Sequence, residues 1–164
     1  MTDRPPRLPA FSYVGRYRYS LTFCAHNRKH VFTDQALVTS MLAQIAHAAR
    51  DWAFAIPAYC FMPDHLHLLV EAQTDDANLV KFAHAVKQRT GFQYRRKSTG
   101  SLWQKGYFEH VLRDEELTEV VARYILANPV RGGLCREPRE YQHAGSLVWS
   151  REQLDELWSV EGTV

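Results

Sequence analysis

Hydrophobic and polar residues alternate along the first part of the chain, and the period then changes from that of a strand to that of a helix. The helical stretch begins at Asp34, a residue type that commonly caps helix N-termini. Two further β-type runs flank Pro63 and Asp64, a pair typical of a tight turn, so these runs should form a hairpin. The predicted elements are a strand over 16–24, a helix over 34–50, and strands over 53–62 and 65–71.

The second half of the chain repeats this change of period. Leu79, Phe82 and Val86 have helical spacing, and a polar loop follows at 97–101. A β-type run comes next, and the acidic residues 114–116 could cap a last helix. The predicted elements are a helix over 78–94, a strand over 107–113, a helix over 114–126, and a short helix over 151–158 in a tail that is otherwise irregular beyond Pro129.

The predicted order βαββαβα favours an α+β fold, a ferredoxin-like split βαβ sandwich with an antiparallel sheet and an added C-terminal helix. The chain has 164 residues and is 46% hydrophobic, enough for one core. We therefore expect a single domain over 1–164, with its core at about 16–134 and a tail at 135–164. No apolar run is long enough for a membrane span and the three cysteines form no CxxC pair, so we expect a cytoplasmic protein without disulfides.

The net charge is only +2, but positive charge is concentrated in the middle of the chain. Residues 81–113 hold eight Lys or Arg against a single acidic residue, which gives +7 and leaves −5 for the rest. A solvated helix face would explain the charge alone. Aromatic residues lie among these charges, as in surfaces that grip phosphates and stack on bases: Phe92, Tyr94, Trp103, Tyr107 and Phe108. The DNA-binding candidates are Lys87, Arg89, Arg95, Arg96, Lys97 and Arg113.

Two residue pairs carry candidate chemistry. His65 and His67 are separated by one residue on a predicted strand, so both imidazoles should face the same side, as two ligands of one metal would. Tyr124 and Asn128 are four apart and should share a helix face. Because Pro129 disfavours helical geometry at Asn128, this residue should lie at the helix end with its amide free to turn outward. Each pair alone could also be an ordinary structural feature.

Several stretches of the chain resemble a known family. Residues 59–70, YCFMPDHLHLLV, resemble the His-hydrophobic-His strand of single-tyrosine HUH transposases. Residues 124–131, YILANPVR, resemble the nucleophile helix of the REP-associated tyrosine transposases, an insertion-sequence-200-like branch. Residues 102–113 resemble the strand that precedes this helix, and His26-Asn27-Arg28 is also similar to this branch. The resemblance covers about residues 16–134.

The resemblance implies a complete mechanism. Tyr124 would attack a DNA phosphorus and form a 5′-phosphotyrosine, while His65, His67 and Asn128 would hold Mg²⁺ or Mn²⁺. Many family members have glutamine where Asn128 stands, although asparagine suits the REP-associated branch, so the third ligand stays open. Arg28 joins the DNA-binding candidates.

The resemblance also implies the partner and the assembly. The substrate would be single-stranded DNA folded into a hairpin, such as a REP-like palindrome. Insertion-sequence relatives form swapped dimers, whereas REP-associated relatives tend to be monomers with a complete site. A monomer is therefore favoured here.

The predicted function is a metal-dependent single-stranded DNA endonuclease and transposase, and three alternatives can be compared with it. A histidine-triad nucleotide hydrolase would need a further histidine where Leu69 stands. A non-catalytic, ferredoxin-like module that binds single-stranded nucleic acid explains the charge, but it gives no role to the His65/His67 and Tyr124/Asn128 pairs. A domesticated member acting on chromosomal repeats would share the chemistry, and the sequence does not separate it from a self-mobilising one.

Overall fold

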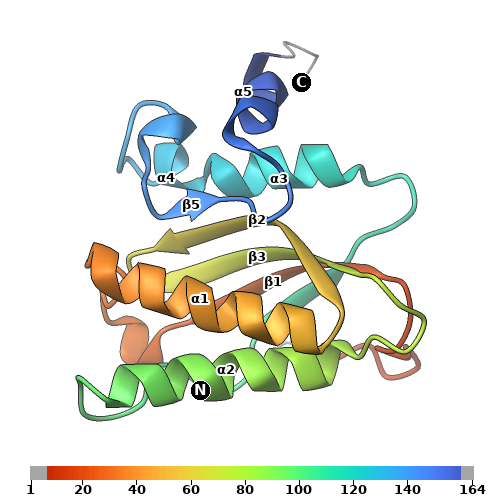
Figure 1. The fold of residues 1–164 in the computed structure, drawn as a ribbon, viewed down its shortest axis with the longest axis horizontal. Coiled ribbons are helices and arrows are strands. Elements are labelled where there is room, and N and C mark those ends of the chain that lie inside the picture. Colours follow the sequence, from red (N-terminus) through yellow and green to blue (C-terminus); the bar gives the residue numbers. More distant parts are fainter. Residues whose placement is uncertain (1–6, 160–164) are drawn as a thin grey trace.

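An antiparallel sheet forms the centre of the computed structural model, which describes residues 7–159 (Figure 1). The strand order is β4-β1-β3-β2-β5, and its first four members have the ferredoxin-like order. The predicted fold class is therefore confirmed. The strands are β1 (Arg18–Cys24), β2 (Phe54–Met62), β3 (His65–Ala72), β4 (Phe108–Val111) and β5 (Ala144–Gly145).

The helices lie in two layers on opposite sides of this sheet (Figure 1). They are α1 (Gln35–Asp51), α2 (Leu79–Arg95), α3 (Thr118–Leu126), α4 (Asn128–Arg131) and α5 (Arg151–Ser159), with short 3-10 turns at His26–Arg28 and Pro138–Glu140. Within the part of the chain that the structure describes, no helix is both long and apolar enough to cross a membrane.

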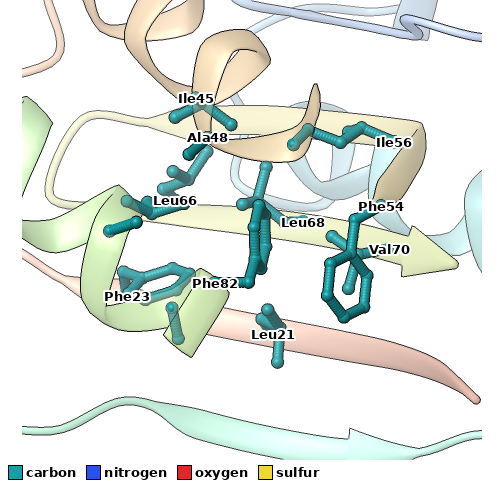
Figure 2. Packing of buried hydrophobic residues seen from close by; sticks show 14 of the residues in the cluster. Leu21, Phe23, Ile45, Ala48, Phe54, Ile56, Leu66, Leu68, Val70 and Phe82 are labelled. Atoms are coloured by element: carbon teal, nitrogen blue, oxygen red, sulfur yellow. The ribbon is translucent and has the colours of Figure 1, made fainter. Parts of the chain in front are cut away.

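The main core lies between the sheet and the α1/α2 layer. The carboxylate of Asp34 caps α1 as predicted, because it accepts the backbone N–H groups of Ala36 and Leu37. Figure 2 shows side chains from alternate positions of β3 meeting those of the two helices: Leu66, Leu68 and Val70 from the strand, and Ile45, Ala48 and Phe82 from the helices. Since strand side chains alternate, His65 and His67 face the other layer.

A second apolar cluster lies on that other face, where α3 packs on β2 and β3. It joins Ala122, Ile125 and Leu126 of α3 to Cys60, Met62 and Leu69 of the sheet. The tail adds to this layer, because β5 pairs with β2 at the sheet edge and Trp149, Leu154 and Trp158 pack against the cluster. Beyond Pro129 the chain is irregular as predicted, apart from the end of α4, a 3-10 turn and β5, and the predicted short helix from Arg151 is confirmed.

One predicted boundary of the last helix is wrong and the other is confirmed, because α3 ends at Leu126 as predicted. The helix α3 begins at Thr118, and no side chain caps its N-terminal residue Leu117. The predicted cap fails because the Glu116 carboxylate accepts the backbone N–H of Arg113 at 2.7 Å and closes a turn. The sequence did not predict that helical geometry would resume at Asn128 after a break at Ala127, where Pro129 occupies the first turn of α4.

Candidate metal and nucleophile site

The two predicted histidine ligands lie together at the start of β3. Their Nε2 atoms are 3.0 Å apart, and their rings are nearly perpendicular, at 87°. Two adjacent ligands of an octahedral ion with bonds of about 2.1 Å would be about 3 Å apart. The spacing of the two nitrogens therefore fits a single divalent ion.

The outer nitrogen of each ring has a partner that fixes the ring's direction. Nδ1 of His65 lies 2.6 Å from Oδ1 of Asp64, and Nδ1 of His67 lies 3.0 Å from Oγ1 of Thr22. Asp64 is held in turn by the Arg28 guanidinium, at 2.8 Å. Such partners set the tautomer and the aim of metal-binding histidines. The sequence predicted Asp64 as a turn residue only, and its contact with His65 was missed.

The electrostatics around His67 keep its ring neutral at neutral pH. Burial lowers the pKa of His67 from its ordinary value of 6.5 to about 4, and the nearby groups of His65, Arg131 and Arg28 act in the same direction. A neutral imidazole is the form that binds a metal. Among residues 7–159 no three His, Cys, Asp or Glu side chains gather as a metal site.

Tyr124 and Asn128 lie where α3 gives way to α4. The Tyr124 side chain is 65% exposed, whereas Asn128 is half-buried. The Asn128 amide is not free to turn outward as predicted, because its Nδ2 donates to the carbonyl of Ile125 at 3.0 Å. Its amide oxygen remains as the atom that could act as a ligand.

The helix α4 lies beside the end of the hairpin that carries the histidines. A Cβ atom placed on Gly132, just after α4, would meet Cε of Met62 at 3.0 Å. Met62 is the register partner of His65. The α3–α4 corner and the histidine pair therefore lie on the same face and at the same end of the sheet.

Arg131 is a site residue that the sequence did not reveal. Its guanidinium carbon lies 3.9 Å from the centre of the Tyr124 ring, and its Nη2 donates to the Tyr124 carbonyl at 2.6 Å. Its charge also helps to lower the pKa of His67. The contact joins two helices, because Tyr124 belongs to α3 and Arg131 to α4.

The predicted DNA-binding residues fall into two groups. Arg95, Arg96 and Lys97 are exposed at the end of α2, and Arg113 is exposed after β4. The others make contacts within the chain. Nζ of Lys87 donates to the carbonyls of Gln104 and Gly106, Arg89 pairs with Asp51 at 2.6 Å, and Arg28 pairs with Asp64. A DNA-binding role stays a prediction for all seven candidates.

Comparisons with known proteins support the fold and identify the family. The model of the family described as "Transposase IS200 like" matches residues 13–128. A Haemophilus influenzae protein assigned as a REP-associated tyrosine transposase is 27% identical over 145 residues, which cover 82% of this chain and 81% of that protein. An uncharacterized protein of the same organism is 23% identical, with 77% of this chain and 88% of that protein covered.

Solved structures agree with this assignment at the level of the fold. A REP-associated tyrosine transposase bound to a REP hairpin superposes with a TM-score of 0.69 at 19% identity, covering 85% of this chain and 81% of that one. A transposase-like protein from Deinococcus radiodurans gives a TM-score of 0.53 at 20% identity, covering 74% of this chain and 97% of that one. The chain therefore belongs to the IS200-like transposase family, a family of DNA-processing enzymes, and within it resembles the REP-associated tyrosine transposases.

Proposed function

We propose that the chain is a metal-dependent endonuclease and strand transferase that cuts and rejoins hairpin-containing single-stranded DNA through a 5′-phosphotyrosine on Tyr124. The observation that carries this proposal is the pair of imidazole Nε2 atoms 3.0 Å apart, each aimed by an outer hydrogen bond, on the sheet face that also carries Tyr124. A non-catalytic binding module would have no use for this arrangement.

The reaction exchanges one phosphodiester for another. The Tyr124 oxygen forms a bond to phosphorus as the phenol loses its proton, and the bond from phosphorus to the DNA 3′ oxygen breaks as that oxygen gains a proton. A phenol is both a usable nucleophile and a usable leaving group, so the released 3′-hydroxyl can reverse the step and rejoin the strand.

His65 and His67, with the amide oxygen of Asn128 as third ligand, would hold Mg²⁺ or Mn²⁺. The ion would neutralise charge on the non-bridging oxygens of the phosphate. Because none of these ligands is anionic, we expect metal binding to be weak until a DNA phosphate completes the shell. The hydrogen bonds of His65 with Asp64 and of His67 with Thr22 would hold the two imidazole rings in the orientation that metal binding needs.

Removal of the metal tests the proposal. A labelled REP hairpin with single-stranded flanks should be cut in Mg²⁺ or Mn²⁺ and left intact in EDTA, and excess divalent ion should restore cutting. Binding of the hairpin should persist in EDTA, which separates loss of chemistry from loss of affinity. Equal cutting with and without the chelator would contradict a metal-dependent mechanism.

The exposed basic cluster at the end of α2, Arg95, Arg96 and Lys97, is proposed to bind the hairpin backbone. Neutralising all three should weaken binding and reduce the log–log salt slope by about 2 to 3, since each lost phosphate contact removes roughly 0.7 to 0.9. A matched control neutralises the exposed tail residues Arg136, Arg139 and Arg151, which changes the net charge equally. Equal slopes for the two triple variants would mean that the cluster is only solvated.

We propose that the site is complete within one chain and that the protein acts as a monomer. The packing of α3 on its own β2 and β3 supports a nucleophile that acts on DNA held by the same chain.

A further inference from the structure

The structure separates the five aromatic residues of the basic segment into two groups. Trp103 is buried, and its indole N–H donates to Thr90. Tyr94 and Tyr107 pack against the main core. Only Phe92 and Phe108 are exposed, at 62% and 43%. The first group belongs to the core of the fold, and only the second could meet a base.

The two exposed phenylalanines lie on different sides of the molecule. Phe92 is on α2, in the helical layer that covers the face opposite the histidines (Figure 1). Phe108 opens β4, where its register partner is Thr22 of β1. The register partner of Thr22 on its other side is His67. Phe108, Thr22 and His67 therefore form one row across three adjacent strands.

Side chains in such a row project to the same face of the sheet. The hydrogen bond from Thr22 to His67 establishes which face this is. Adjacent strands are about 4.8 Å apart, so the Phe108 backbone lies about 10 Å from that of His67. The helix α3 packs on β2 and β3, at the other end of this row. The next pair of register partners on β1 and β4 that projects to the same face is Ser20, which is half-buried, and His110, which is exposed.

We propose that Phe108 is a stacking platform for an unpaired nucleobase, in the single-stranded flank next to the phosphodiester that is cut. The proposal rests on the proposed function for the position of that phosphodiester, at the histidine pair. An exposed aromatic ring binds any base through its π-face, and the row leads from this ring directly to the metal ligands. The base beside the cut would be held by the sheet, while the hairpin contacts lie elsewhere.

A double-mutant cycle, which combines a substitution at Phe108 with removal of a base from the DNA, tests this contact. Binding is measured in EDTA, for wild type and Phe108→Leu, against a REP hairpin whose flank carries one abasic position at a time. Leucine keeps apolar bulk but removes the π-face. In wild type one abasic position should cost about 5- to 150-fold in affinity, the range for base stacking. In Phe108→Leu the intact flank should lose a similar factor, and the same abasic position should cost nothing further.

Two comparisons make the result specific. Phe108→Trp should restore both the affinity and the sensitivity to the abasic position. Phe92→Ala removes an exposed phenylalanine from the far layer and should keep the wild-type abasic pattern. Thermal unfolding of each variant shows that the fold is retained, as expected for an exposed side chain. If wild type and Phe108→Leu lose affinity equally at every abasic position, the stacking proposal is wrong. Because no cleavage is needed, this result is independent of whether the chain cuts DNA.

Discussion

Replacing Tyr124 with phenylalanine should abolish covalent attachment to DNA and lower the cleavage rate by about 10³-fold or more, as removal of a nucleophile does in covalent enzymes. The substitution removes one oxygen atom. The ring is 65% exposed, and within residues 7–159 its hydroxyl makes no hydrogen bond. We therefore expect the free energy of unfolding to change by less than about 0.5 kcal/mol. Hairpin affinity should also be retained.

The control variants for this prediction are Tyr94→Phe and Tyr107→Phe, which alter the other tyrosines of the basic segment and its strand. Both rings pack against the core, and burial raises the pKa of Tyr107, which makes its phenolate harder to form. These variants should still form the adduct. If one of these variants lost the adduct while the Tyr124 variant still formed it, the nucleophile would be that other tyrosine, and the class of enzyme would be unchanged.

Replacing His67 with alanine should remove metal-supported cleavage while leaving the fold and most hairpin affinity intact. Loss of an outer partner of a metal ligand typically costs 10- to 100-fold in metal affinity or activity, so loss of a ligand should cost more than about 100-fold. The rate is measured over a series of Mn²⁺ concentrations, because a weakened site should need more ion. Cutting at the wild-type rate in Mg²⁺ would exclude His67 as a ligand.

Two further variants should retain more metal-supported cleavage than His67→Ala does. Asp64→Asn keeps both imidazoles but weakens the hydrogen bond that aims His65, and it should fall between wild type and His67→Ala. His47→Ala removes an exposed histidine from α1, in the opposite layer, and should cut like wild type. A metal requirement that was equally weakened in all three variants would point to a general loss of stability.

The features that follow from local periodicity could be predicted from the sequence. The period-2 pattern of β3 correctly predicts that His65 and His67 share a face and that Leu66 is buried. The turn at Pro63 and Asp64 and the cap at Asp34 are local in the same way. Such features need only neighbouring residues to form, so a sequence pattern is enough to find them.

The features that were missed depend on contacts between distant parts of the chain. Arg18 donates to the carbonyls of Arg113 and Glu116 and to the hydroxyl of Thr118, and so holds the turn that delays the start of α3. The two-residue strand β5 exists because β2 offers it an edge. Neither contact leaves a periodic pattern in the sequence.

The candidate site shows the same division between local and long-range features. Its ligand pair could be predicted from spacing, whereas its supporting residues could not. Arg28 reaches Asp64 from a turn in which both Asn27 and Arg28 have positive φ, and Arg131 reaches Tyr124 from α4, across the break at Ala127 that separates it from α3. Among the basic candidates, the charge count could not tell Lys87, which holds two backbone carbonyls, from the exposed cluster at the end of α2.

The covalent mechanism is tested most directly by identifying the residue that becomes attached to DNA. Wild-type protein is incubated with a single-stranded REP hairpin and Mn²⁺, denatured, treated with nuclease and protease, and examined by mass spectrometry. We expect one modified peptide, with a nucleotide joined through its 5′-phosphate to Tyr124. A modified peptide that contains another tyrosine would contradict the residue assignment. Absence of any adduct, with hairpin binding intact and with each divalent ion tried, would contradict the covalent mechanism and favour a non-catalytic binding module.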